Sequence, residues 1–457
     1  MNRRGFFLGC VSAATTLFLA VGPAGETGIS GAADEAVPVW AKRIDNMWGG
    51  VRVSGGLADA QGGCLAVGDS GYSSNLDAWA VHLDKSGAVL DQKTYAGSQH
   101  DRLTSICAAV DGGYLAAGWT RFKGVGLFEE GGVGLLMKLG SRLDPAWVKT
   151  FSASPTMSRL TKILTLAKNQ GYLAVLAFEE NALTRRAVLR LNAKGGILWA
   201  RKLGDVETSF QCVDAIQTPD GGFVLAGNLY KGYESGDGCV VKIDSGGRFQ
   251  WAKAFGEGGA ASERVSSVLT MGGGDLLLIG DSYKEQAGLA LKLDPRGNLK
   301  WQNAYKDQAG FAEGLDFGIA LRGGAFAFVG SYCSNGVRIV FARCSATGKI
   351  LQTKSYIAFG GPAPNYYETL VRALPSSDGG VFILVTEVMG DVVAAKMDLQ
   401  GTLPKTCALA AWTASASKSK YTLADAPLAY TSLRVTVKAA SVKAKSVPYA
   451  SGDACGR

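Results

Sequence analysis

Basic residues recur in this sequence about every fifty residues, each near the end of a segment in which large apolar side chains alternate. The seven positions are His82, Lys138, Arg190, Lys242, Lys292, Arg343 and Lys396. Together they could form a ring, which invites a functional interpretation. A cation within a buried strand, however, needs a carboxylate or carbonyl partner, and Asp77, Asp237 and Asp391 each stand five residues before one of them. We therefore interpret the basic positions as structural, with these acids as candidate partners.

Acidic residues share a second equivalent position, counted back from a glycine turn that follows it in every copy. The acids are Asp101, Glu263, Glu313 and Glu368, and the other three copies carry Arg159, Phe210 and Val51 there. Four carboxylates and one arginine around an axis, beside Tyr366 and Tyr367, could bind a cation such as calcium or a polyhydroxyl ligand. The alternative is that the acids cap local backbone or pair with lysines.

Histidine chemistry is sparse, because His82 and His100 are the only histidines of the chain. His100 stands beside Asp101, and we include it among the candidate ligand-binding residues, but no nucleophile motif accompanies it. We predict no catalytic residue. The sequence has no CxxC pair or His/Cys cluster, so we expect neither a metal site of the usual types nor a bound cofactor, apart from the calcium considered above.

The elements that must position these residues are repeated hairpins. In six copies the basic residue and the matching position of the following strand are eleven residues apart, as in Lys242 and Lys253. A turn such as "DSGG" separates the two strands, and Trp147, Trp199, Trp251 and Trp301 mark the second strand in four copies. A glycine turn such as "DGGFVLAG" precedes each hairpin and occurs seven times. Short strands, tight turns and a fifty-residue period indicate four-stranded units, with strands a to d in chain order.

The seventh unit lacks a strand d of its own, because "TLPKTCALA" around Cys407 carries neither Trp nor a basic residue where they are expected. A spare strand d, "VWAKRI" at residues 39–44, stands near the N-terminus. We therefore predict an all-β fold, a seven-bladed β-propeller closed by an N-terminal strand that completes the last blade, with a short β-rich C-terminal tail. Closure removes the exposed edges that a linear array would have.

The two faces of the predicted disc differ. The tight a–b and c–d turns fall on one face, the turn face, and the d–a and b–c connections fall on the other, the loop face. The loop-face segments differ in length and content, as in "WTRFKGVGLFEEGGVG" and "AFGGPAPNYYETL". Because function on repeat scaffolds concentrates where the repeats differ, we expect a ligand to bind at the loop face.

The repeats resemble the "DGGyxlaG … DxWxxKxDxxGxxxW" units of secreted bacterial and archaeal β-propeller proteins, over roughly residues 38 to 403. That family is largely of unassigned function, so the resemblance implies a scaffold and a compartment. "KIDSGGRFQW" is also similar to the docking repeats of quinoprotein dehydrogenases. It departs from them in its basic residue, in the blade number and in lacking an adjacent cysteine pair.

The first 33 residues read as an export signal. Arg3 and Arg4 precede an apolar run, and small residues suited to cleavage follow near Ala32 and Ala33. "NRRGFF" resembles the twin-arginine type, and an ordinary secretory signal is the alternative. We expect residues 34–403 to form the propeller of a periplasmic or secreted protein without a transmembrane segment in its mature chain.

The tail, residues 404–457, is rich in Ala, Ser, Lys and Thr and has a cysteine near each end. We predict a disulfide between Cys407 and Cys455, with unpaired or intermolecular cysteines as the alternative. The sequence does not determine the pairing of the six propeller cysteines, which are Cys64, Cys107, Cys212, Cys239, Cys333 and Cys344.

The formal charge of +8 is spread along 457 residues, so we predict no nucleic-acid partner. The leading functional hypothesis is a monomeric, non-enzymatic binding or scaffolding protein that takes a protein or glycan ligand at the cell envelope. The alternative is a propeller enzyme that acts on a glycan or carries a quinone-type redox cofactor.

Overall fold

The computed structural model describes residues 37–453 apart from a set of short segments, and the statements below concern the described residues. The segments outside the description are 47–49, 73–74, 97–99, 121–131, 182, 205–207, 232–235, 257–262, 283, 308–314, 334–336, 358–370, 387–391, 406, 408, 411–413, 419–422, 426–429, 435, 441–442 and 447–448. The predicted signal segment and Cys455 also lie outside it.

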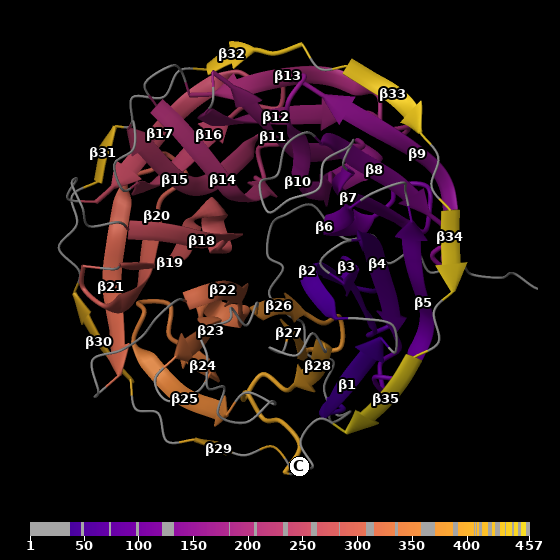
Figure 1. Ribbon diagram of the computed structural model, residues 1–457. Coiled ribbons are helices and arrows are strands. Elements are labelled where there is room, and N and C mark those ends of the chain that lie inside the picture. Colours follow the sequence, from indigo (N-terminus) through magenta and orange to yellow (C-terminus); the bar gives the residue numbers. More distant parts are fainter. Residues whose placement is uncertain are drawn as a thin grey trace, which may run out of the picture.

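Seven antiparallel sheets surround a central axis, which confirms the predicted seven-bladed propeller (Figure 1). The innermost strands are β2 (Val51–Ala58), β6 (Asp101–Ala108), β10 (Ser158–Thr165), β14 (Thr208–Gln217), β18 (Glu263–Thr270), β22 (Leu315–Ala320) and β26 (Val371–Pro375). The second strands are β3 (Cys64–Tyr72), β7 (Tyr114–Thr120), β11 (Tyr172–Glu180), β15 (Phe223–Lys231), β19 (Leu276–Ser282), β23 (Phe326–Cys333) and β27 (Val381–Thr386). Short 3-10 turns follow three innermost strands, at η1 (Ala167–Asn169), η2 (Gly272–Gly274) and η3 (Arg322–Gly324).

The outer half of each blade follows the predicted hairpin. The third strands are β4 (Asn75–Leu83), β8 (Val133–Leu139), β12 (Leu183–Leu191), β16 (Asp237–Ile243), β20 (Ala287–Leu293), β24 (Val337–Cys344) and β28 (Val392–Met397). The fourth strands are β5 (Val89–Ala96), β9 (Pro145–Ser152), β13 (Ile197–Leu203), β17 (Phe249–Phe255), β21 (Leu299–Asp307), β25 (Ile350–Ile357) and, in the seventh blade, β1 (Trp40–Asn46).

The N-terminal strand closes the ring. β1 pairs antiparallel with β28, with Trp40 opposite Lys396 and Ile44 opposite Val392. The seventh blade is thus built from both ends of the repeat region, as the sequence predicts.

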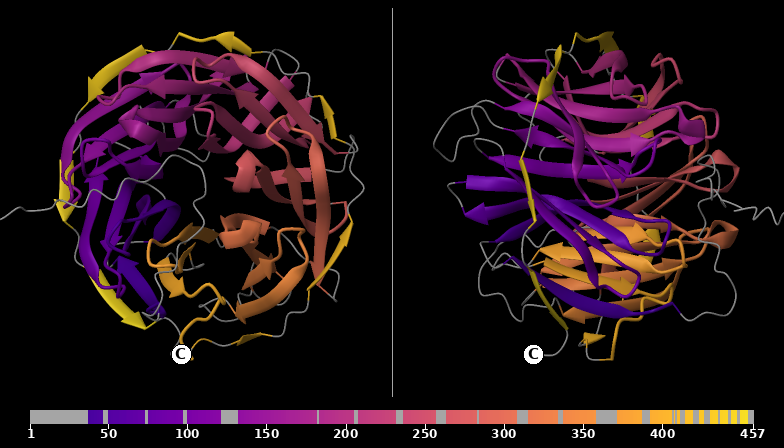
Figure 2. Two further views of the ribbon diagram at one scale, coloured as in Figure 1. Left: turned by 180° about the vertical axis from the view of Figure 1, so that it is seen from behind. Right: turned by 90° about the vertical axis from the view of Figure 1, so that its right-hand side faces the viewer.

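The C-terminal tail forms a fifth strand on every blade. Its strands are β29 (Leu409–Ala410), β30 (Ala414–Lys418), β31 (Leu423–Asp425), β32 (Tyr430–Ser432), β33 (Thr436–Ala440), β34 (Lys443–Ser446) and β35 (Tyr449–Asp453). They pair in turn with β25, β21, β17, β13, β9, β5 and β1, so the tail runs round the rim against the direction of the blades. We call residues 409–453 the belt; Figures 1 and 2 show it in yellow at the outer edge of the disc.

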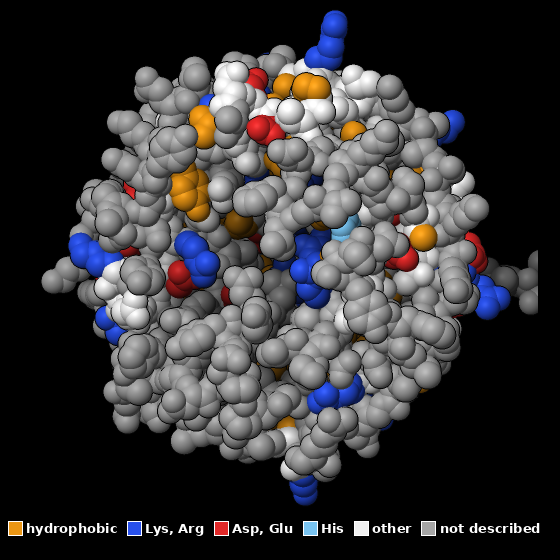
Figure 3. Space-filling model, viewed as in Figure 1, with side chains coloured by type: hydrophobic (Ala, Val, Ile, Leu, Met, Phe, Trp, Pro, Cys, Tyr) orange, Lys and Arg blue, Asp and Glu red, His pale blue; other side chains and the backbone are white. Residues whose placement is uncertain are grey.

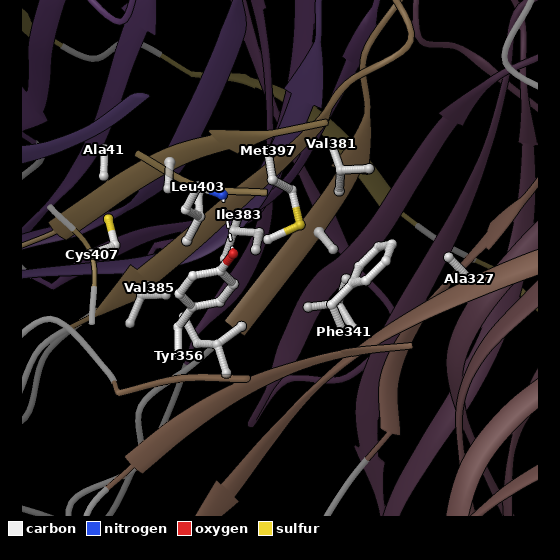
Figure 4. Packing of buried hydrophobic residues seen from close by; sticks show 14 of the residues in the cluster. Ala41, Ala327, Phe341, Tyr356, Val381, Ile383, Val385, Met397, Leu403 and Cys407 are labelled. Carbon is white, nitrogen blue, oxygen red and sulfur yellow. Dashed lines mark hydrogen bonds between the residues drawn. The ribbon is translucent and has the colours of Figure 1, made fainter. Parts of the chain in front are cut away.

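The core lies between the blades, because each apolar cluster joins two neighbouring sheets. The cluster between the sixth and seventh blades contains Phe341 and Tyr356 from one blade and Ile383 and Met397 from the other (Figure 4). Tyr356 also links the blades, since its hydroxyl donates to the Gly401 carbonyl at 2.7 Å and accepts from the Leu403 amide at 3.1 Å.

The recurring tryptophans make a second kind of contact between blades, in which a ring packs on a turn of the neighbouring blade. The Trp199 ring packs on the c–d turn of the next blade, where a Cβ added at Gly247 would lie 2.9 Å from it. Gly247 has a φ of 74°, which favours glycine. Trp40 makes the same contact with Gly87 and donates its Nε1–H to the Lys85 carbonyl at 2.9 Å. The Trp and the turn glycine therefore recur together because five blades pack a Trp on the turn of the next blade.

Candidate functional site at the axial mouth

The basic residues of the third strands are structural, although their partners differ from those predicted. In five blades the partner is an acid of the a–b turn: His82 with Asp59 at 2.8 Å, Lys138 with Asp111 at 3.1 Å, Lys242 with Asp220 at 2.9 Å, Lys292 with Asp275 at 3.3 Å, and Lys396 with Asp378. Arg190 donates instead to the Tyr172 and Leu191 carbonyls, and Arg343 to the Gln400 side chain. The reason is the register of the second and third strands. His82 lies opposite Leu65, two residues beyond the a–b turn glycine Gly63, so its side chain reaches the turn.

The candidate site lies where the innermost strands begin, at the loop face around the axis; we call this opening the mouth. Six innermost strands, β2 to β22, share a register shift against the second strand, as at Val53 and Gly55 in β2. Counted from this shift, the residue equivalent to Asp101 and Glu263 in the third blade is Ser158. Arg159 stands one residue further on and belongs to a different row.

The difference comes from the turn that follows β10. Six a–b turns are closed by a hydrogen bond from a backbone amide to the carbonyl four residues later, as from Asp59 to Gly63. In the third blade the acceptor is five residues later, because the Leu166 amide donates to the Gly171 carbonyl. Counting back from the turn glycine therefore shifts the assignment in this blade by one residue.

The two predicted acids within the described residues are buried in the blades. Asp101 is 1% exposed and Glu263 is 0% exposed. Oε1 of Glu263 accepts a hydrogen bond from the Ser282 hydroxyl at 3.2 Å. The structure therefore does not bring these carboxylates together at an open mouth. Glu313, Glu368, Tyr366 and Tyr367 lie outside the described residues.

His100 has a local structural contact at the start of β6. Its Nδ1 accepts a hydrogen bond from the Leu76 amide at 3.1 Å, which joins the d–a connection to β4. This contact makes Nδ1 the unprotonated nitrogen of the ring.

Arginines, which the counting from the turns overlooks, line the mouth instead. Arg52, Arg102, Arg159 and Arg264 are each the second residue of an innermost strand, and each follows a buried position. Because neighbouring residues of a strand face opposite sides, their side chains lie on the other, more exposed side of these innermost strands. The repeated triplets "VRV", "DRL", "SRL" and "ERV" are the signal that could have found this row. Figure 3 shows Lys and Arg side chains gathered near the middle of the disc.

Buried carboxylates hold three of these arginines, Arg52, Arg102 and Arg264. Asp69 is 1% exposed and accepts from Nη2 of Arg52 at 2.7 Å and from Nε of Arg102 at 2.6 Å, so that one acid joins two blades. Asp281 accepts from Nη2 of Arg264 at 2.8 Å. The Arg52 and Arg264 side chains remain 52% and 56% exposed. Charged hydrogen-bond donors with fixed orientation therefore face the solvent at the mouth.

Further charged groups lie along the axis. Lys162 pairs with Asp214 at 2.7 Å across the third and fourth blades. Arg372 donates from Nε to the Ser54 carbonyl at 3.0 Å, joining the seventh and first blades. Burial raises the pKa of the Asp316 carboxyl to about 6, against the lowering by its bond from Ser331 and by Arg372.

Among the described residues no group of three or more His, Cys, Asp or Glu side chains is arranged to hold a metal ion. Five cysteines, Cys64, Cys107, Cys212, Cys239 and Cys344, are buried free thiols, and burial raises the pKa of each. In the part of the chain that the structure describes, no helix has the length and apolarity to cross a membrane.

Comparisons with known proteins add little. No protein-family model and no curated protein matches the chain. Among solved structures, two of Sqt1 from Chaetomium thermophilum are similar at 10% identity, covering 79% and 77% of this chain and 98% and 99% of theirs, with TM-scores of 0.43 and 0.38. A third, of Sqt1 bound to the N-terminus of the ribosomal protein L10, is 8% identical, with coverages of 77% and 98% and a TM-score of 0.43. Likenesses this weak carry no argument about partners.

Proposed function

We propose that this protein is an exported binding or scaffolding protein whose partner, a protein or glycan at the cell envelope, docks on the loop face. The observation that supports the proposal is the contrast between the two faces. The mouth presents exposed arginines, whereas the recurrent polar residues of the turn face are used by the fold itself.

The turn face shows this use in six of the seven c–d hairpins, where the first residue of the turn caps backbone amides. Asp244 accepts at Oδ1 from the amides of Gly246 and Arg248 at 2.9 and 2.8 Å, and Asp294 binds the corresponding amides of its own turn. The a–b turn acids are engaged by the basic residues of the third strands. These contacts close tight turns and stabilise blades, so the repeated chemistry of this face has a structural explanation.

The loop face has no such repetition. Its connections differ in sequence from blade to blade, and the arginines at its centre extend into solvent. A surface with blade-specific loops around a charged opening suits a specific partner. Export is an expectation from the N-terminal sequence, whose residues lie outside the described part of the chain.

Site-specific photo-cross-linking in the producing cells tests this proposal. Lys284, exposed on a b–c connection of the loop face, and Lys85, exposed on a c–d turn, form a matched pair for replacement by a photoreactive phenylalanine analogue. We expect discrete adducts of higher mass from position 284 and none from position 85. Adducts from position 85 alone, from both positions equally, or from neither would contradict docking on the loop face.

A further inference from the structure

We propose that the mouth binds an acidic peptide segment, whose carboxylates are held by the arginines that begin the innermost strands. This inference rests on the proposed function and names the chemistry of its partner. Three observations support it: the arginines form one row, buried acids orient them, and they lie on opposite sides of the axis.

The row is defined by strand register. In each of these strands the register shift follows the third residue, and the arginine is the second residue. This holds for Arg52, Arg102 and Arg264, and for Arg159 in β10. The four arginines are therefore at one level of the mouth. Gln211 has this place in the fourth blade, and it adds an amide to the row.

The acids behind the row fix the guanidinium groups without covering them. Arg52 and Arg264 each engage their carboxylate through Nε and Nη2, and Arg102 engages Asp69 through Nε. These bonds leave the Nη1 side of each guanidinium as the side that a ligand can approach. Asp69 is almost completely buried and Asp281 is 8% exposed. A ligand in the mouth therefore meets N–H donors, while the oxygens that balance their charge are shielded.

Arg159 differs from the other three in its support. Its guanidinium lies over the Trp119 ring of the preceding blade, 4.9 Å from the ring centre. Stacking on an aromatic ring fixes the orientation of the guanidinium plane.

The arrangement round the axis favours a peptide. Arg52 and Arg102 share Asp69 in the first two blades, whereas Arg264 belongs to the fifth blade, on the other side of a seven-bladed ring. Successive side chains of an extended peptide point to opposite sides. Consecutive Asp or Glu residues can thus reach both groups at one level, and Arg matches a carboxylate through two parallel hydrogen bonds.

Binding of a fluorescein-labelled hexaglutamate peptide, followed by fluorescence anisotropy, tests the inference. The test variant is Arg264→Gln and the matched control is Arg248→Gln. Both arginines are more than half exposed and pair with one aspartate, at 2.8 and 2.7 Å, but Arg248 lies on a turn-face hairpin. We expect the Kd to rise about tenfold or more for Arg264→Gln, as for the loss of a charged hydrogen bond, and to stay unchanged for Arg248→Gln.

A second measurement uses the unmodified protein, in case Arg264→Gln does not fold. A benzophenone-labelled hexaglutamate peptide should cross-link to the starts of the innermost strands, near residues 52–54, 102–104 and 264–266. No binding, equal loss in both variants, cross-links confined to the turn face, or tighter binding of an oligouronate than of the peptide would overturn the inference. Loop-face adducts in cells without peptide binding would refute this inference and leave the proposed function standing.

Discussion

Lys42 and Asp453 lie opposite each other in neighbouring antiparallel strands, so the first and last strands of the described chain share one sheet. β1 thereby has two tasks, completing the seventh blade on one edge and receiving the end of the belt on the other. The ring and its belt are closed at the same place.

Deleting residues 39–44 should therefore destabilise the protein strongly. The seventh blade would lose its fourth strand and expose the edge of β28, and the end of the belt would lose its partner. We expect a large fall in melting temperature and in the denaturant midpoint, or failure to fold. A melting temperature equal to that of the unaltered protein would contradict the assignment of β1 as the closing strand.

Removal of the belt should have a milder effect. A chain that ends at Leu403 keeps four strands in every blade and, apart from Cys407, the buried residues of the apolar cluster between the sixth and seventh blades. It exposes the outer edges of seven sheets, and such edges pair with those of other molecules. We expect a folded ring with a lower melting temperature and concentration-dependent association, measured by thermal denaturation and light scattering. A truncated protein that stays monomeric with unchanged stability would show that the belt does not protect these edges.

Much of the fold was predictable because the repeat is carried by side chains. Turn glycines, alternating apolar residues and the Trp that packs on the next turn recur at fixed spacing, and together they specify blade number and closure. The belt strands have no such side chains recurring at fixed spacing in the sequence. Its strands pair through the main chain, so small or polar residues such as those around Ala416 and Ser417 suffice, and composition predicts a β-rich tail without its course.

At the predicted mouth the structure places side chains other than those that the sequence analysis named. Counting residues in the sequence locates the start of each innermost strand. It does not tell which of two adjacent residues is buried in the blade and which is exposed at the mouth. Asp101 is buried, whereas Arg102 beside it is partly exposed and reaches Asp69 of the first blade. The longer turn after β10 displaced the assignment of Arg159 for a related reason.

The predicted disulfide would close the belt. Cys407 is buried, and Cys455 lies outside the described residues, so the disulfide between them stays a prediction. β29 and β35 lie on neighbouring blades, β25 and β1 being their partners, so this bond would turn the belt into a covalent loop round the disc. Such a loop stabilises by on the order of 4 kcal/mol in the chain-entropy model.

Reductant should accordingly lower the melting temperature of the unaltered protein and leave that of Cys407→Ser unchanged, because the five described propeller thiols are already free. Peptide mapping under non-reducing conditions should recover Cys407 linked to Cys455. Recovery of another partner for Cys407 would refute the predicted pairing.

Asp316 should make stability depend on pH. Burial raises its pKa to about 6, with Asp281 acting in the same direction and Ser331, Arg372 and Arg264 acting against it. Between the unfolded pKa near 4 and the folded value, the native state holds a proton that the unfolded state does not. Its contribution to stability is therefore complete below about pH 4 and is lost as the pH rises through about 6.

We expect Asp316→Asn to remove this loss. The midpoint of urea unfolding, measured from pH 4 to pH 7, should fall more steeply with rising pH in the unaltered protein than in the variant. Parallel profiles would show that Asp316 does not titrate in this range. Asp77, whose pKa burial also raises, offers a control position in the first blade, because Asp77→Asn should leave the Asp316 contribution in place.

Glu263 distinguishes a structural acid from a calcium ligand. Its side chain is fully buried and accepts from the Ser282 hydroxyl, whose oxygen in turn accepts from the Glu285 amide at 3.0 Å. Glu263→Gln, alone or with Glu313→Gln, should therefore lower the melting temperature by the same amount with and without calcium, because an altered buried hydrogen-bond network costs about 1 to 3 kcal/mol.

A calcium site would behave differently: calcium would raise the melting temperature of the unaltered protein in proportion to its mass-action linkage, and the variant would lose that rise. Thermal denaturation of both proteins across a calcium titration separates the two outcomes, and a calcium-dependent rise confined to the unaltered protein would overturn the structural assignment.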